Sequence, residues 1–187
     1  DGIIKRLEHF PEINSAMIYS GPHIGVANST FKCSYSQCRL NSDYANIDLT
    51  HIPKKYFQRC NYMPNLNSSD YHDKLPCTTW KTTFNDNYMV CNRAMLNKTG
   101  ERTLICTIIP PGTAFINALF GMTFKRPFTT IVGTMCSLPF DFYVKLTGKD
   151  NGRFDTLSYL PVLDNSIFAN EISLRSLLLN CITEYYS

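Results

Sequence analysis

The chain has 187 residues and a formal net charge of +3, and 44% of its residues are hydrophobic and 18% charged. This composition is that of a globular protein that can bury a substantial core. It contains no apolar run of about 18 residues, so it predicts no membrane span, and residues 1–13 lack the pattern of a signal peptide. Because the chain starts with Asp1 and ends without a polar tail, we expect a fragment of a longer protein.

Two interpretations fit the eight cysteines. Together with sequons at Asn28, Asn67 and Asn97, they are compatible with a secreted, disulfide-bonded glycoprotein module. The cysteines lie, however, in apolar contexts such as LICTII and LLLNCIT, where a free thiol behaves as a small hydrophobe. We therefore predict reduced cysteines and a cytoplasmic location, with the secreted module as an alternative. Cys33 and Cys38 form the closest pair, and no second pair supports a metal site.

In chain order, residues 1–73 are rich in Gly, Pro, Asn and Ser and predict a loop-rich N-terminal part with few regular elements. Residues 74–187 are predicted to contain strands and then helices. Strand patterns are strongest over 87–96 and 102–109, and the turn sequence NKTGE between them favours an antiparallel ladder. The Pro-Pro-Gly sequence at 110–112 must end the second strand, because proline donates no backbone hydrogen bond.

Shorter elements are predicted after this turn. Residues 113–124 are expected to form a strand or a short helix. Residues 127–148 have the length of two short helices, which are broken near Ser137, a candidate N-cap, and stop at Gly148. Residues 154–163, FDTLSYLPVL, are expected to be short and extended.

An amphipathic helix is predicted at the end of the sequence, with Asp164 or Asn165 as its N-cap. Apolar residues recur there at helical spacing, at Leu174, Leu178, Cys181, Ile182 and Tyr185. We expect this face to lie in the core. The whole chain, residues 1–187, is predicted to be a single α+β domain with a mixed, largely antiparallel sheet and packed helices.

The sequence IIPPG at 108–112 raises the possibility of adenine methylation. In adenine-N6 DNA methyltransferases the catalytic loop is Asp/Asn/Ser-Pro-Pro-aromatic. Its polar side chain accepts from the adenine amino group, and its ring stacks on the flipped base. Ile109 and Gly112 flank the prolines here, so neither group is present. The sequence contains no glycine-rich cofactor loop, no P-loop and no GxSxG motif. Asp141 and Lys145 match the acidic and lysine residues of a metal-dependent nuclease only loosely. We predict no catalytic residue, no cofactor and no metal in this chain.

A basic stretch indicates nucleic-acid binding instead. Residues 74–126 carry seven Lys or Arg against two acidic residues, and a local basic surface is the minimum footprint of phosphate binding. Arginine and lysine suit phosphates and guanine, whereas asparagine suits adenine. The candidate DNA contacts are Lys81, Arg93, Lys98 and Arg102, then Asn92 and Asn97 for base reading, and His23. The alternatives are a plain hairpin with a polar face and, for His23, a structural turn histidine.

Six phrases occur in an order that resembles a known family: AMIYSGPHIGVANSTFK, IDLTHIPKKYFQRCNYMPN, ERTLICTIIPPG, SLPFDFYVKLTG, LSYLPVL and LRSLLLNCITEYY. Together they resemble the region downstream of the catalytic domain in large adenine-specific DNA methyltransferases. These include the type IIG restriction–modification enzymes and related phage-defence methylases. The resemblance covers residues 16–187. It breaks at ANSTF, where the family has Asn-Pro followed by an apolar residue.

This resemblance implies that the chain is a target-recognition domain. Such a domain would read double-stranded DNA beside the catalytic methyltransferase domain of the same chain, which would bind S-adenosylmethionine and flip the adenine. The catalytic and cofactor-binding motifs of the family match nothing in this sequence, so the fragment is expected not to be an enzyme by itself. A protein-interaction or scaffold domain within such an enzyme is the alternative.

Overall fold

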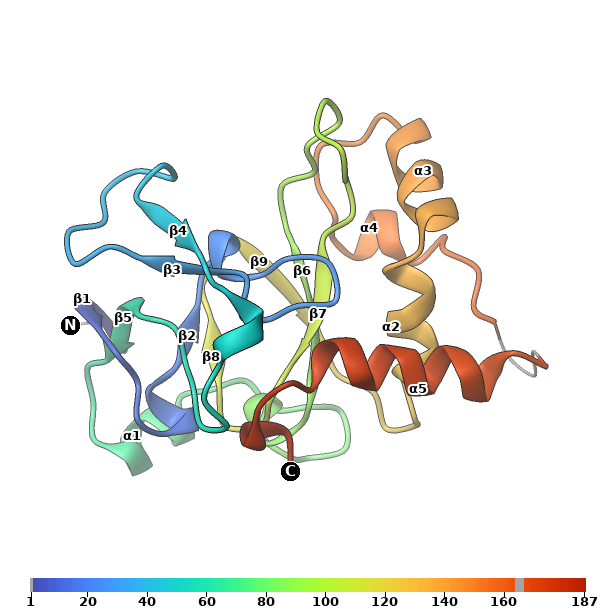
Figure 1. The fold of residues 1–187 in the computed structure, drawn as a ribbon. Helices are drawn as coiled ribbons and strands as arrows, with labels where there is room; N and C mark the ends of the chain where they lie inside the picture. Colours follow the sequence, from blue (N-terminus) through green and yellow to red (C-terminus); the bar gives the residue numbers. More distant parts are fainter. Residues whose placement is uncertain (1, 164–166) are drawn as a thin grey trace.

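A three-stranded antiparallel sheet forms the centre of the fold in the computed structural model, which describes residues 2–163 and 167–187 (Figure 1). Its order is β7 (Cys106–Ile109), β6 (Met89–Arg93) and β9 (Leu119–Met122). The predicted antiparallel ladder and the α+β class are confirmed. The strand β7 is shorter than predicted, because the N–H groups of Thr103 and Leu104 donate to the Asp141 side chain instead of a neighbouring strand.

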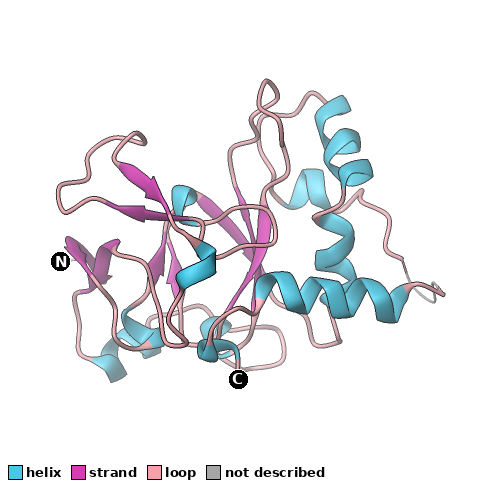
Figure 2. Cartoon of the chain, in the orientation of Figure 1, coloured by secondary structure: helices cyan, strands magenta, loops and turns pink. Residues whose placement is uncertain are grey.

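Both faces of this sheet are buried. Along β6, Met89 and Cys91 face one apolar cluster, which the N-terminal part completes with Met17, Tyr19 and other side chains. Val90 faces a second cluster, which the C-terminal helices complete. This alternation follows from the two-residue period of a strand and makes β6 apolar on both sides. Figure 2 shows the result, with the helices of the C-terminal part on one side of the sheet and the smaller sheets on the other.

In the described residues, two strand pairs lie within the N-terminal part, and a third connects it to the rest of the chain. The strand β1 (Ile4–His9) pairs antiparallel with β5 (Cys60–Pro64), and β3 (Lys32–Ser34) pairs antiparallel with β4 (Tyr44–Asn46). A short parallel pair joins β2 (Ile18–Tyr19) to β8 (Ala114–Phe115) and so ties this part to the connection between β7 and β9. Long connections and the short helix α1 (Ser68–Asp73) separate these strands.

The turn after β7 is a scaffold feature. β7 ends at Ile109, as the two prolines predict. Gly112 has a φ of +83°, a conformation that favours glycine. Its N–H donates to the Asn85 carbonyl at 2.6 Å, and the Asn14 amide donates to the Pro111 carbonyl at 2.6 Å. The turn is thereby fixed to two other segments.

Four helices cover the other face of the sheet. The predicted break is confirmed, because α2 (Thr129–Met135) ends just before Ser137 and α3 (Leu138–Leu146) begins after it. Gly148 follows with a φ of +68°. The extended conformation predicted for residues 154–163 is wrong over residues 154–160, because the first four form α4 (Phe154–Leu157) and the next three form a turn. There the buried Leu157 packs into the helix-side cluster.

The last helix, α5 (Ala169–Asn180), buries a different face from the one predicted. Leu174 and Leu178 are 55% and 69% exposed, whereas Ser176 and Asn180 are buried. The reason is the close approach of α2, where a Cβ on Gly133 would come within 2.5 Å of Ile172. The predicted caps Asp164 and Asn165 lie outside the described residues. Of the apolar set, Cys181, Ile182 and Tyr185 lie beyond the helix, and Tyr185 stacks on Phe57 with ring centroids 4.0 Å apart.

The outer edge of β7 is covered by three unrelated groups. The Ala27 N–H donates to the Cys106 carbonyl at 2.8 Å, and the Tyr186 hydroxyl donates to the Ile108 carbonyl at 2.8 Å. The side chain of Asn180 binds the Ile108 N–H. An uncovered edge would expose unpaired backbone groups to other chains, so these contacts close the sheet on that side.

All eight cysteines are unpaired in the structure, and their burial ranges from the buried Cys91 to the exposed Cys77. Within the described ranges, none of the helices has the length and apolar character needed to cross a bilayer.

Candidate nucleic-acid interface

The strand register sends the basic residues of 74–126 to opposite ends of the central sheet. Met89 pairs with Ile109, and Arg93 pairs with Leu119. The segment before Met89 and the segment after β9 therefore lie at one end of the sheet, and the connection between β6 and β7 lies at the other end (Figure 1). Lys81 belongs to the first segment, so it is separated from the residues of that connection. The sequence stretch is basic, but it does not form one patch.

Two of the predicted arginines hold the fold together. The Arg93 guanidinium donates to the carbonyls of Gly21 and Ile24 at 3.0 and 2.7 Å, and burial lowers its pKa. The Arg102 guanidinium donates to the Cys136 carbonyl at 2.8 Å and forms an ion pair with the buried Asp141 at 3.3 Å. Both guanidiniums thus satisfy groups inside the protein.

Asn92 and His23 have no exposed surface. The Asn92 amide donates to the Gly152 carbonyl at 2.7 Å. His23 Nδ1 accepts the Ser20 N–H at 3.0 Å, which makes it a structural residue of the Gly-Pro turn. Burial lowers the pKa of His23 to about 4, an effect that the Arg59 carbonyl only partly offsets. Because both side chains are buried, neither can contact DNA in this conformation.

Three predicted residues are accessible. Asn97 Oδ1 accepts the N–H groups of Thr99 and Gly100 at 3.1 Å and shapes the turn after β6. Beside it, Lys98 donates to the Gly148 carbonyl and pairs with an exposed aspartate, Asp150. Lys81 is exposed at the far end of the sheet, in a strained conformation with a φ of +69°. Of these three accessible residues, Asn97 and Lys98 lie at the same end of the sheet as Arg93.

A groove opens at that end, next to the residues that Arg93 contacts. It consists of two adjoining hollows of about 710 and 170 Å³, which share Arg6, Cys38 and Arg39. Its walls are β1, β5 and the 35–43 connection between β3 and β4, which projects from the body of the protein (Figure 1). The polar lining consists of Arg6, Glu8, Ser20, Ser36, Gln37, Arg39, Asn41, Tyr44, Asn61 and Tyr62.

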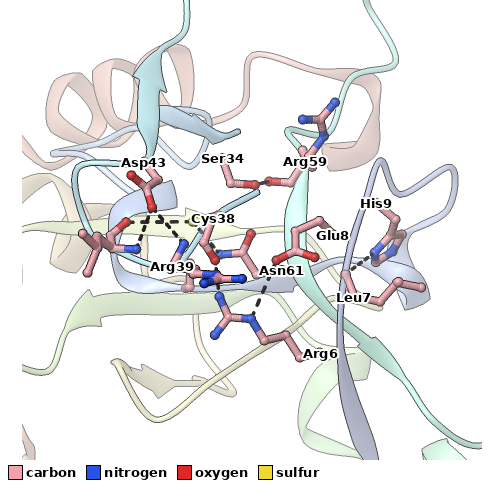
Figure 3. Close-up of polar contacts among 12 residues, drawn as sticks. Arg6, Leu7, Glu8, His9, Ser34, Cys38, Arg39, Asp43, Arg59 and Asn61 are labelled. Atoms are coloured by element: carbon pink, nitrogen blue, oxygen red, sulfur yellow. Dashed lines mark hydrogen bonds and ion pairs between the residues drawn. The ribbon is translucent and has the colours of Figure 1, made fainter. Parts of the chain in front are cut away.

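Arg6 and Arg39 come from elements far apart in sequence and lie side by side over this groove (Figure 3). Arg6, on β1, donates to the Cys38 carbonyl and lies 3.7 Å from the carboxylate of Glu8. Arg39 is held by its backbone, because its N–H donates to Asp43 at 2.9 Å. No hydrogen bond or ion pair in the described part of the chain engages the Arg39 guanidinium, which is exposed.

The carboxylate of Asp43 is used inside the connection. It accepts the N–H groups of Arg39 and Leu40 at 2.9 and 2.8 Å, and these hydrogen bonds lower the pKa of Asp43. A carboxylate that caps backbone donors fixes the turn while its charge is partly satisfied. Glu8 is then the acidic side chain that faces the two guanidiniums, so the groove has a net positive charge.

The floor of the groove is polar and internally hydrogen-bonded. The Asn61 amide donates to the Tyr44 hydroxyl at 2.6 Å, and burial raises the pKa of Tyr44 to about 12. The ring of His23 lies edge-on to Tyr44, with centroids 5.6 Å apart. Asn61 Oδ1 is buried and has no partner among the described residues, so it is an unused acceptor beneath the groove.

No local concentration of charge marks this groove in the sequence. Residues 1–73 are balanced in charge overall, and Arg6 and Arg39 converge only when β1, β3, β4 and β5 have paired. A local signal was present in SQCRLNSD, where an aspartate follows a polar turn and can cap it.

The described residues contain no group of three His, Cys, Asp or Glu side chains that could hold a metal ion. Comparisons of the chain with protein-family models, with curated proteins and with solved structures gave no match. What the groove can do must therefore be inferred from its own chemistry.

Proposed function

We propose that this chain binds double-stranded DNA and acts as a target-recognition domain for an adenine-specific DNA methyltransferase or a type IIG restriction–modification enzyme. The observation that carries the proposal is the pair of guanidiniums, Arg6 and Arg39, side by side over a groove with amide and hydroxyl groups. Guanidiniums bind phosphates and guanine edges, and amides bind adenine edges.

The β3–β4 ribbon supplies a means of entering the DNA. Two antiparallel strands fit the width of the major groove, and the connection at the tip of this ribbon exposes Gln37, Arg39 and Asn41. We assign base reading to these three side chains. Arg6 lies behind them on β1, where it suits a phosphate of the DNA backbone. Lys98, at the same end of the central sheet, would extend the phosphate contacts.

The chain would position DNA rather than modify it. The proposed partner is the catalytic domain of the parent methyltransferase, which would hold S-adenosylmethionine and the flipped adenine. The outer face of α5 provides an apolar surface for such a domain, because Leu174 and Leu178 are largely exposed. The fixed floor of Tyr44 and Asn61 would keep the reading ribbon in register with that partner.

The experiment is a fluorescence-anisotropy titration of a labelled duplex with the chain at low salt. Arg39→Glu should weaken binding by about tenfold or more, since a good base or phosphate contact contributes about 1–3 kcal/mol. Lys55→Glu makes the same charge change at an exposed residue beside Lys54, whose carbonyl binds the Glu184 N–H far from the groove. Equal affinities of the two variants would refute the placement of the interface.

A scaffold or protein-interaction domain within the same kind of enzyme is the second candidate. The exposed leucines of α5 favour it, because an apolar helix face of this kind is typical of a surface that another domain covers. The titration separates the two functions. A scaffold domain would bind DNA without salt dependence or not at all, whereas a DNA-reading domain would lose affinity steeply as salt increases.

A further inference from the structure

Two cysteines from different elements meet between the central sheet and α2. Cys106 begins β7 and is fully buried, and Cys136 is the residue that caps the end of α2. Their Sγ atoms lie 3.4 Å apart. A disulfide bond of about 2.05 Å therefore requires only a small movement of the two side chains. Both thiols lie on the helix side of the sheet, away from the proposed DNA interface.

Cys136 is the thiol that a reagent reaches first. It is half-buried and lines a cavity of about 200 Å³ between α2 and α5, whereas Cys106 is 0% exposed. The guanidinium of Arg102 donates to the Cys136 carbonyl at 2.8 Å and places a positive charge beside the pair. Such a charge favours the thiolate, the form of cysteine that reacts.

The two thiols also polarise each other. The hydrogen bond from Cys106 lowers the pKa of Cys136, and the same hydrogen bond raises the pKa of Cys106 well above its usual value. The more acidic thiol is thus the accessible one, and the less acidic thiol lies directly behind it. This is the arrangement of an attacking cysteine with a resolving cysteine.

We propose that Cys106 and Cys136 form a redox-active dithiol that a small-molecule disulfide oxidises to an intramolecular disulfide. The Cys136 thiolate attacks one sulfur of the reagent, whose S–S bond breaks and releases a thiolate. Cys106 gives its proton to that thiolate and attacks Cys136 Sγ, which breaks the mixed disulfide and releases the second thiolate. The reagent accepts two electrons and leaves as two thiols, with protons that match those lost by the two cysteines.

The new bond would join β7 to the junction between α2 and α3. It would therefore link the sheet covalently to the helical layer, and the oxidised protein should unfold at a higher denaturant concentration than the reduced protein. It would also leave two fewer free thiols than the eight of the reduced chain.

The test treats the folded whole chain with oxidised glutathione, quenches with acid, alkylates the free thiols in denaturant and maps the peptides. A Cys77→Ser background removes the exposed cysteine, which would form an adduct of its own. The expected product is one disulfide between the peptides of Cys106 and Cys136, without a lasting glutathione adduct on Cys136. Recovery of both cysteines in alkylated form would overturn the proposal.

Two variants test the order of the steps. In Cys106→Ser the glutathione adduct on Cys136 should persist, because no resolving thiol is left. Cys91→Ser is the matched control, since Cys91 is equally buried but packs in the other cluster, and its removal should leave the crosslink unchanged. Folding of each variant is checked by circular dichroism, and the peptide map of the background protein decides the proposal if Cys106→Ser does not fold.

Discussion

Asn180, the last residue of α5, accepts the backbone N–H of Ile108 on β7 through its Oδ1 atom at 2.8 Å. The same oxygen accepts the Thr107 hydroxyl at 2.8 Å, and the Asn180 amide donates to the Ser176 carbonyl at 2.7 Å. The Asn180 side chain thus supplies the acceptor that a neighbouring strand would supply to β7, and it also hydrogen-bonds the last turn of α5.

Asn180→Ala should lower the free energy of unfolding by about 2–4 kcal/mol, because it leaves the Ile108 N–H and the Thr107 hydroxyl without this buried acceptor. Leu178→Ala is the comparison, since Leu178 is 69% exposed on the same helix and should change stability by less than about 0.5 kcal/mol. Urea unfolding followed by circular dichroism measures both. A larger loss for the leucine variant would show that the helix packs through the face that its sequence pattern favours.

Asp141 anchors α3 in a similar way. Its Oδ1 atom accepts the N–H groups of Thr103 and Leu104 at 2.8 and 2.7 Å and lies 3.3 Å from Arg102. We expect Asp141→Ala to cost about 3 kcal/mol, since two buried donors and a half-buried charge lose their partner. Asp141→Asn keeps an oxygen acceptor and should cost about 1 kcal/mol.

The control for Asp141 is Asp155→Ala, which removes a carboxylate from a largely exposed ion pair with Lys149. It should cost less than about 0.5 kcal/mol. Equal effects of Asp141→Ala and Asp155→Ala in chemical denaturation would mean that the Asp141 carboxylate does not organise the 103–104 backbone.

His23 makes stability depend on pH. Burial lowers its pKa to about 4 in the folded state, against about 6.5 for an unfolded histidine. Between these values the unfolded chain binds more protons, so stability is complete above about pH 6.5 and is lost as the pH falls toward 4. The free energy of unfolding is expected to fall by about 2 kcal/mol between pH 7 and pH 4.5.

His23→Asn offers the Ser20 N–H an oxygen in place of Nδ1 and does not titrate in this range. Its unfolding free energy should vary less between pH 7 and pH 4.5 than that of the wild type, by about the amount assigned to His23. The exposed histidines His51 and His72 are present in both proteins, so their contributions cancel. Identical pH profiles would show that folding does not change the pKa of His23.

The parts of the fold that the sequence predicts well are those with a local cause. The two prolines after Ile109 end β7 wherever the strand lies, and the Ser137-Leu138-Pro139 sequence separates α2 from α3. The sequence predicts the wrong face of α5, because the helical spacing of Leu174 and Leu178 favours a buried apolar face. The actual contact depends on the absence of a side chain at Gly133.

The candidate site depends on pairing that no local pattern records. Arg93 and Arg102 were predicted to face DNA from their charge, but they lie where carbonyl groups of other segments converge and bind those instead. Arg39, in contrast, has no such partner in the described chain, because Asp43 binds its backbone and leaves its guanidinium free. Tertiary context, rather than residue type, decides which arginine is available.

Arg6 and Asn41 provide the last prediction, which separates phosphate contacts from base contacts. Arg6→Gln should weaken binding to all duplexes similarly and reduce the slope of log affinity against log salt by about 0.9, the loss of one phosphate contact. Asn41→Ala should leave that slope unchanged and alter which duplexes are selected from a randomised library, because an amide reads base edges. A changed salt slope for Asn41→Ala, or altered sequence selection with Arg6→Gln, would reverse the assigned roles of the ribbon tip and β1.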